Sequence, residues 1–286
     1  MTASTIFPRE RVTVVGVLNA TPDSFSDGGR LVNDEGAVDV DAAIAVAARM
    51  IEAGAQMIDV GGESTRPGAM ETPLRIEIDR TAPLVEALTK RFAVKISIDT
   101  RKAAVAEAAL SAGAQVVNDV SGLGFDAALA GITAAAGASL IVGHLRGTPE
   151  TMQQNPHFDD VLGEVAMELG ASLAVARTAG ILDERLAVDP GIGFGKRLED
   201  NLALLANAGS LGVTLGLPVL VGPSRKQFLG SLTGDPVECR DVATTAACAV
   251  AIFAGADAVR VHDVAGAVRA AAIASALRDA RRETIA

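Results

Sequence analysis

The sequence predicts an α/β fold, a single (β/α)8 barrel with its active site at the carboxyl ends of the strands. Eight apolar stretches alternate with alanine-rich stretches of helical periodicity. The apolar stretches lack polar alternation, which is typical of strands that helices cover in a parallel sheet. Eight such units fit 286 residues, because this barrel commonly takes about 250 residues. A doubly wound open sheet is the alternative.

The first predicted strand covers residues 12–19 and contains four valines before it reaches Asn19. Proline, aspartate, serine and glycine follow it, and these residues favour turns and loops. The same change from apolar to polar residues recurs along the chain. The eight predicted strands are residues 12–19, 57–63, 95–100, 116–121, 139–146, 186–194, 218–225 and 258–263.

Helices are predicted over residues 41–53, 102–112 and 160–179, and glycine follows each of them. Glycine is the residue preferred just beyond a helix end. An Ala-Gly pair also stands at residues 254–255, before the last predicted strand. No Ser/Gly-rich or Pro-rich linker interrupts the repeat, so residues 1–286 are expected to form one domain.

Charge and composition restrict the class of function. The formal net charge of −10 argues against broad binding of nucleic acid or of an anionic membrane. The most apolar window, residues 246–256, is too short to cross a bilayer, and the first residues lack the apolar core of a signal peptide. Cys239 and Cys248 form no zinc pattern and are expected to be buried free thiols. We expect a soluble, cytoplasmic protein.

Polar side chains stand at the ends of the predicted strands, where a barrel of this class places its active site. Asp99, Asn118 and Asp189 interrupt otherwise apolar strands. Two carboxylates and an amide that converge can accept hydrogen bonds from the ring N–H and amino groups of a planar heterocycle. The alternative is that each residue caps a helix or satisfies a neighbouring loop.

Cationic side chains form a second group at the strand ends, namely Arg66, Lys226, Arg260 and His262. Such a group in an acidic protein favours a pocket for phosphate or carboxylate. Arg260 and His262 are two residues apart, so they face the same side of a strand. The alternative is that Arg260 and Lys226 form structural ion pairs with Asp99 or Asp189.

Two long loops are predicted at the barrel mouth, residues 20–31 and 64–73, and Phe25 lies in the first. Long loops there often close over a site and exclude water. Residues 191–196 resemble a phosphate-binding loop, but they lack the spacing of the Walker motif. Protein ligands for a metal are few, so Mg²⁺ would depend on an oxygen such as that of Asn19, with substrate phosphates and waters.

The chain resembles the dihydropteroate synthase family in eight motifs that occur in order along almost all of its length. They are GVLNATPDSFSDGG (16–29), IDVGGESTRPGA (58–69), SIDT (97–100), VNDV (117–120), GTPETMQ (147–153), DPGIGFGK (189–196), GPSRK (222–226) and RVHD (260–263). The resemblance implies a (β/α)8-barrel enzyme of folate biosynthesis. Such an enzyme joins 6-hydroxymethyl-7,8-dihydropterin diphosphate to 4-aminobenzoate and releases pyrophosphate.

The resemblance also implies roles for individual residues. The pterin ring would be held by Asp99, Asn118, Asp189, Lys226 and Phe194. The diphosphate would be bound by Asn19, Arg260 and His262 with Thr65 and Arg66, and Mg²⁺ by Asn19. The aminobenzoate would be framed by Phe25, Thr65, Arg66, Pro67, Phe194, Ser224 and Lys226. Lys226, Arg260, His262 and Asn19 would carry the catalysis, sulfonamides would compete with 4-aminobenzoate, and the protein would be a homodimer.

One position departs from the family pattern, because Gly143 stands where the family usually carries a methionine that lines the pterin pocket. The pocket would then be wider, or Leu145 or another neighbour would fill the space. Two other functions are considered. They are a pterin methyltransferase of the methyltetrahydrofolate type and a non-catalytic paralogue that binds a pterin without turnover.

Overall fold

A computed structural model describes residues 6–8, 11–22, 31–32 and 38–285. Within these ranges eight parallel strands form one sheet in the order β6-β5-β4-β3-β2-β1-β8-β7. A parallel bridge between Val188 and Val219 joins the two ends of this order, and Val188 N donates to Pro218 O at 3.0 Å. The sheet is therefore a nearly closed barrel. The predicted barrel is confirmed, and the open doubly wound sheet is wrong.

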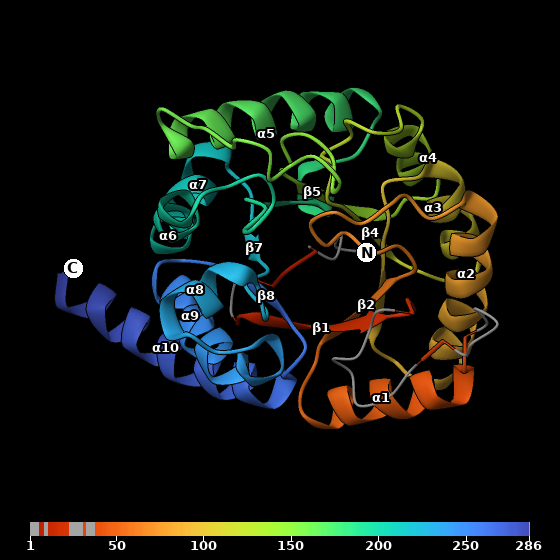
Figure 1. The fold of residues 1–286 in the computed structure, drawn as a ribbon, viewed down its shortest axis with the longest axis horizontal. Helices are drawn as coiled ribbons and strands as arrows, with labels where there is room; N and C mark the ends of the chain where they lie inside the picture. The colour runs from red at the N-terminus through yellow and green to blue at the C-terminus, as the bar shows by residue number, and fades with distance from the viewer. Residues whose placement is uncertain (1–5, 9–10, 23–30, 33–37, 286) are drawn as a thin grey trace.

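Helices surround the strands as a ring (Figure 1). The strands are β1 Thr13–Asn19, β2 Met57–Gly61, β3 Lys95–Asp99, β4 Val116–Asp119, β5 Ser139–Gly143, β6 Leu186–Asp189, β7 Leu220–Val221 and β8 Ala258–Val261. The α-helices are α1 Val40–Glu52, α2 Leu74–Arg91, α3 Ala103–Ser111, α4 Leu129–Ala135, α5 Val161–Thr178, α6 Leu198–Ala206, α7 Ala208–Leu215, α8 Gln227–Thr233, α9 Asp241–Phe253 and α10 Val264–Ile285. The described ranges also contain the short 3-10 helices η2 Asp183–Arg185 and η3 Val237–Cys239.

The predicted helix ends are confirmed by the backbone. The Asp39 side chain caps α1 by accepting from Ala42 N at 2.9 Å. Gly54, Gly113 and Gly180 follow α1, α3 and α5 with φ of 106°, 107° and 99°, a conformation that only glycine adopts readily.

Several strands are shorter than predicted, because the chain leaves the sheet before the last residues of the predicted stretches. The stretch 186–194 is a strand only over Leu186–Asp189. Pro190 has no N–H to donate to a sheet, and Gly191 has a φ of 68°. The stretch 218–225 is a strand only over Leu220–Val221. Ser224 and Lys226 therefore lie between β7 and α8, whereas Asp189 is the last residue of β6.

The barrel interior differs between its two ends. Near the amino ends of the strands it is filled by an apolar cluster, which consists of Ile6, Phe7, Val15, Met57, Val116, Ile141, Ala187, Leu220 and Ala258. Further along the barrel, buried residues on β2, β3 and β4 are polar, among them Asp59, Ser97 and Asn118. This places the polar chemistry at the carboxyl ends of the strands. A separate and larger apolar cluster packs the outer faces of the strands against the helices.

The two cysteines differ in environment. Cys248 on α9 is buried and Cys239 on η3 is exposed, so the prediction of two buried thiols is wrong for Cys239. The cause is that Cys239 belongs to a short surface helix rather than to the apolar run that follows it. None of the helices in the described ranges is long and apolar enough to cross a membrane.

Candidate active site

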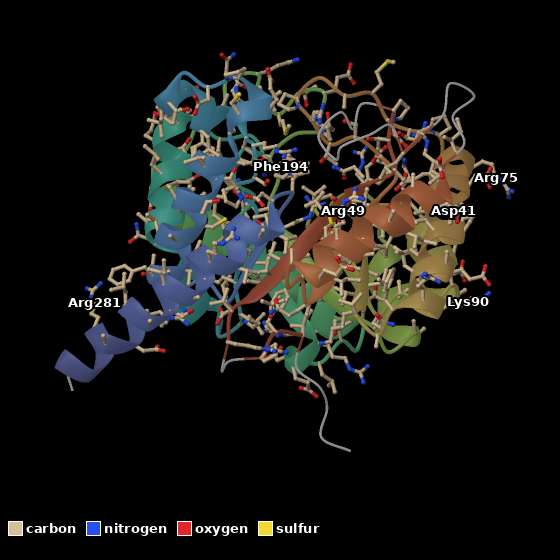
Figure 2. The ribbon with its side chains drawn as sticks, turned by 90° about the horizontal axis from the view of Figure 1, so that it is seen from below. Asp41, Arg49, Arg75, Lys90, Phe194 and Arg281 are labelled. Carbon is tan, nitrogen blue, oxygen red and sulfur yellow. The ribbon has the colours of Figure 1, made fainter. Side chains whose placement is uncertain are left out.

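A cavity of about 690 Å³ opens at the carboxyl ends of the strands. The predicted residues among those that line it are Asn19, Thr65, Arg66, Pro67, Asp99, Phe194, Ser224, Lys226, Arg260 and His262. A small recess beside it is lined by Asn118 and Asp189 together with Asp99, Lys226 and Arg260. In Figure 2, Phe194 lies toward the same end of the barrel as Arg75 at the start of α2, whereas Lys90 near the end of α2 lies toward the other end. Phe25 lies outside the described residues.

A buried aspartate that the sequence analysis did not single out connects two of the predicted residues. Asp59 Oδ2 accepts from Arg260 Nε at 2.5 Å and from Asn118 Nδ2 at 3.0 Å. Arg260 Nη2 also donates to Asp99 Oδ2 at 2.6 Å. The ion pair between Arg260 and Asp99, considered above as an alternative, is therefore present. Because the Asn118 amide nitrogen is bound to Asp59, its amide oxygen remains to accept from a ligand.

Lys226 makes a different set of contacts from those of Arg260. Its ammonium group donates to Ile192 O and lies 3.9 Å from the ring centroid of Phe194. This cation–π contact joins the chain after β7 to the loop after β6. Burial lowers the pKa of Lys226 to about 8, although the negative charge of Asp189 opposes this effect.

Two buried carboxylates and two cations line the recess, namely Asp99 and Asp189 with Lys226 and Arg260. Arg260 is also paired with Asp59. Burial raises the pKa of Asp99 to about 7 and also raises the pKa of Asp189, while the cations partly offset the effect. A ligand that donates hydrogen bonds to these carboxylates would supply the interactions that the protein leaves unmade. A planar ring with N–H and amino groups meets this requirement.

His262 lines the cavity, and one of its ring nitrogens lacks a hydrogen-bond partner among the described atoms. Ser224 Oγ accepts from His262 N at 3.1 Å and lies 2.8 Å from His262 Nδ1, so the serine hydroxyl proton is directed to Nδ1. This arrangement assigns the remaining proton to Nε2, which is buried and has no partner among the described atoms. Burial, with the charges of Arg225 and Arg260, lowers the pKa of His262 to about 3. The ring is therefore a neutral N–H donor, suited to a phosphate oxygen.

Asn19 ends β1 and lines the cavity. Its amide oxygen packs against the next strand, since a Cβ built on Gly61 would lie 3.2 Å from it. Among the residues that the structure describes, no group of three or more His, Cys, Asp or Glu side chains could hold a metal ion. The donor set thus fits Mg²⁺ only as one protein oxygen that is completed by substrate phosphates and waters, the usual arrangement for this ion.

A second buried lysine supports the loop that carries Phe194. Lys196 Nζ lies 2.9 Å from His144 Nδ1 and donates to Phe194 O at 3.1 Å, and His144 Nε2 is paired with Glu168 at 2.9 Å. Burial lowers the pKa of Lys196 to about 7. No prediction for Lys196 came from the sequence, because residues 191–196 fail as a Walker motif.

Gly143 on β5 is closely covered by the neighbouring strand. A Cβ at this position would lie 2.7 Å from both Asp119 O and Val120 Cα. Backbone atoms at the end of β4 therefore fill the position that the Cβ atom of a methionine would occupy. Of the two possibilities that the sequence left open, filling by a neighbour is the one observed, and that neighbour is not Leu145.

Replacing Gly143 by methionine is expected to destabilise the protein. The clash is with backbone atoms, which no rotation of the new side chain relieves, and overpacking of this kind costs about 1–3 kcal/mol. Gly143→Ala should lose a similar amount, because the clash begins at Cβ. Urea unfolding of the two variants measures the loss. A Gly143→Met protein as stable as the wild type would show that the strand ends are not held at this separation.

Comparison with known proteins supports the same assignment. A family model described as "Pterin binding enzyme" matches residues 15–262. The chain is 45% identical over 256 residues to a dihydropteroate synthase of Synechocystis. The matched region covers 89% of this chain and 86% of that protein. It superposes on a Yersinia pestis dihydropteroate synthase in a sulfonamide complex with a TM-score of 0.88 and 41% identity, over 94% of this chain and 95% of that one. A Xanthomonas albilineans dihydropteroate synthase with 4-aminobenzoic acid gives a TM-score of 0.84 and 41% identity, over 94% of both chains. The chain therefore belongs to the pterin-binding enzymes and, among them, to the dihydropteroate synthases.

Proposed function

We propose that this dihydropteroate synthase binds the pterin ring in the recess formed by Asp99, Asn118, Asp189, Lys226 and Phe194. The observation that carries this proposal is the pair of buried carboxylates, Asp99 and Asp189, that line the recess, together with an Asn118 amide oxygen that is directed by Asp59. The pterin amino group and ring N–H would donate to these oxygens. Lys226 would donate to an acceptor on the ring.

The diphosphate is proposed to lie between Asn19, Thr65, Arg66, Arg260 and His262. The neutral Nε2–H of His262 and the Arg260 guanidinium would stabilise the charge that grows on the departing pyrophosphate. Mg²⁺, held by Asn19 with the phosphate oxygens, would supply further charge stabilisation. The 4-aminobenzoate would lie against Phe25, Thr65, Arg66, Pro67, Phe194, Ser224 and Lys226.

In the proposed reaction the bond between the pterin methylene carbon and the diphosphate oxygen breaks, and pyrophosphate leaves with the electron pair. The amine nitrogen of 4-aminobenzoate forms a bond to that carbon and loses a proton to pyrophosphate or to water. Loop residues 64–73 would exclude water from the electron-poor carbon. The products are 7,8-dihydropteroate and pyrophosphate.

The test is product formation by the full chain with the pterin diphosphate, 4-aminobenzoate and Mg²⁺, followed by mass spectrometry. Dihydropteroate should appear, and chelation of Mg²⁺ should suppress it. Pterin binding without product would favour a non-catalytic pterin-binding protein. Transfer of a methyl group from methyltetrahydrofolate would favour the methyltransferase alternative.

Other properties belong to the same proposal. We propose one domain over residues 1–286, a homodimer and a cytoplasmic location, for which the free cysteines are consistent with a reducing compartment. Sedimentation measures the oligomeric state.

Sulfonamides are expected to inhibit the enzyme in competition with 4-aminobenzoate. Thr65, Arg66 and Pro67, which belong to the proposed 4-aminobenzoate site, line the cavity. The apparent KM for 4-aminobenzoate should rise with sulfamethoxazole concentration at constant kcat. Full turnover at saturating sulfamethoxazole would contradict this expectation.

The pH dependence of kcat/KM should show the titration of Lys226. Its pKa is lowered to about 8, so the ammonium group is present below this pH and is lost above it. The kcat/KM for the pterin diphosphate, which reflects the free enzyme, should therefore fall about tenfold per pH unit above pH 8. In Lys226→Arg the fall should disappear, because arginine stays protonated. An unchanged alkaline limb in that variant would exclude Lys226 as its origin.

A further inference from the structure

Phe194 lines both the recess and the larger cavity beside it. Its ring faces the Lys226 ammonium group, with 3.9 Å between the ring centroid and Nζ. A glycine stands on either side of it, and Gly193 and Gly195 have φ of 81° and 63°. Because glycine restricts the backbone less than any other residue, the position of the Phe194 ring depends on the contacts that hold its loop.

Lys196 holds the carbonyl group of Phe194. The lysine is 4% exposed, and its Nζ donates to Phe194 O at 3.1 Å. Gly193, directly before Phe194, is held as well, because its N–H donates to Asn201 Oδ1 at 2.6 Å and its carbonyl oxygen accepts from Gln153 Nε2 at 2.9 Å. Lys196 is therefore the side chain that holds the backbone of Phe194 itself on the far side of these contacts.

The contacts behind Lys196 determine which atom donates each proton. Burial alone would raise the pKa of Glu168, but its hydrogen bonds to Arg146 and His144 lower it, so Glu168 is a carboxylate. Burial, with the charge of Lys196, lowers the pKa of His144 to about 4, so this ring is neutral. Nε2 of His144 donates to Glu168 at 2.9 Å, which leaves Nδ1 to accept from Lys196 at 2.9 Å.

Lys196 can make both contacts whether or not it is charged. Burial lowers its pKa to about 7. A neutral amine retains two N–H donors, and His144 Nδ1 and Phe194 O are two acceptors. The hydrogen bond to Phe194 therefore persists across the pH range in which this lysine titrates.

Stability alone gives a weak reason for a lysine at this position. A lysine whose pKa falls on folding binds fewer protons in the folded chain than in the unfolded one, so its charge opposes folding at neutral pH. Methionine is similar in length and would fill the space without that cost. It could not donate a hydrogen bond to Phe194 O. The donor to the loop is therefore what the lysine contributes.

We propose that Lys196 is a positioning residue that holds the Phe194 ring against the Lys226 ammonium group. His144 and Glu168 orient Lys196. The proposal rests on the proposed role of Lys226 in binding the pterin ring. Lys196 lines the cavity, but its amine is bound to protein atoms and need not touch the reacting atoms. Its effect reaches the substrate through Phe194 and Lys226.

The pKa of Lys226 tests the proposed contact directly, because the face of an aromatic ring favours the charged form of a lysine. The chain has five lysines, so ¹³C labelling of lysine Cε gives few NMR signals, and the Lys226 signal is the one lost in Lys226→Arg. In Lys196→Met the pKa of Lys226 should fall by about one pH unit. The charged groups that act on Lys226, namely Asp189, Arg260 and Asp99, stay in place in this variant. Removal of a like charge alone would instead raise this pKa.

The same variant should lose activity in a pH-dependent way. A pKa lower by about one pH unit reduces the charged fraction of Lys226 about fivefold at pH 8 and less than about twofold at pH 6. The kcat/KM for the pterin diphosphate should fall in these proportions. The matched control is Lys95→Met, since Lys95 also donates to a backbone carbonyl, Ile6 O at 3.2 Å, but at the amino end of β3. It should change neither the pKa of Lys226 nor kcat/KM.

Two variants of His144 test the orientation of Lys196 and decide the question if Lys196→Met does not fold. His144→Leu removes the acceptor of Lys196 and should also lower the pKa of Lys226. His144→Asn retains an acceptor, because its amide oxygen lies near the position of Nδ1, and should keep the pKa of Lys226 close to the wild-type value. Equal effects of the two variants would overturn the proposal.

The outcomes separate this proposal from the proposed function. A wild-type protein that makes no dihydropteroate overturns the function, whereas a lower pKa of Lys226 in Lys196→Met still supports the positioning role. An unchanged or raised pKa of Lys226 in a folded Lys196→Met protein overturns the positioning role, even if the wild type is active. A loss of kcat/KM that is equal at pH 6 and pH 8 and parallels a loss of thermal stability also overturns it.

Discussion

Replacing Lys226 by alanine is expected to lower kcat/KM at least about a hundredfold, the size typical of losing one group that stabilises the transition state. Thermal stability should change little. Burial opposes the charge of Lys226, as its lowered pKa of about 8 indicates, so the folded protein gains little from it. Steady-state kinetics and thermal unfolding on the same preparation measure the two effects.

The control for Lys226→Ala is Lys90→Ala, which removes a lysine whose side chain is 72% exposed and should change neither quantity. A Lys226→Ala protein that loses stability in proportion to its activity would contradict the expectation. It would show that Lys226 acts mainly as a structural partner of Asp189.

Replacing Arg260 by methionine should have the largest effect on folding of any change in the site. Arg260 is the ion-pair partner of both Asp59 and Asp99, and the Asp59 side chain is 1% exposed. Removing one partner of a buried ion pair typically costs about 3–5 kcal/mol, because the remaining charge is buried without compensation. Urea unfolding measures the free energy, and catalysis should be lost as well.

The pH dependence of the stability of Arg260→Met checks whether the unpaired carboxyls cause the loss. Without the guanidinium, the pKa of Asp99, which burial already raises to about 7, should rise further above that of the unfolded chain. The folded variant then binds more protons than the unfolded one, so it should regain stability as the pH falls from 8 to 5. The exposed counterpart Arg75→Met, which breaks a pair with Asp79, should cost less than about 1 kcal/mol at every pH. An Arg260→Met protein of wild-type stability would mean that Asp59 and Asp99 do not depend on this arginine.

The fold could be predicted because its signal is local and repeated. Each strand is an apolar run buried on both faces, and glycines such as Gly54 and Gly113 mark the helix ends. Strand ends were less predictable. The stretch 186–194 reads as one apolar run, and the departure of the chain at Pro190 depends on the pairing of β6 with its neighbours.

The site was predictable where a polar residue stands alone at the end of an apolar strand, as Asp99 and Asn118 do. Asp59 shows the same signal in mid-strand and was missed because neighbouring strands are staggered. Asp59 pairs with Ser97, and Gly61 pairs with Asp99, so the height of a residue in the barrel cannot be read from one strand alone. Lys196 was missed for another reason. Its partner His144 lies 52 positions away, and only the folded chain brings them together.

Arg260 belongs to both proposed sites, the one for the pterin ring and the one for the diphosphate. Its guanidinium is bound to the carboxylates at the base of the recess, yet it also lines the larger cavity beside His262. One residue therefore connects the proposed ring site and the proposed diphosphate site. This position is suited to couple the orientation of the ring to the departure of pyrophosphate.

The pterin recess, the neighbouring cavity with Arg66, Arg260 and His262, and loop 64–73 are proposed to act on one reaction, which the release of pyrophosphate reports. The full chain with the pterin diphosphate and Mg²⁺ should release pyrophosphate rapidly only when 4-aminobenzoate is present, in equal amounts with dihydropteroate. Pterin binding with neither pyrophosphate nor dihydropteroate would contradict the account. It would identify the protein as a pterin-binding chain without turnover.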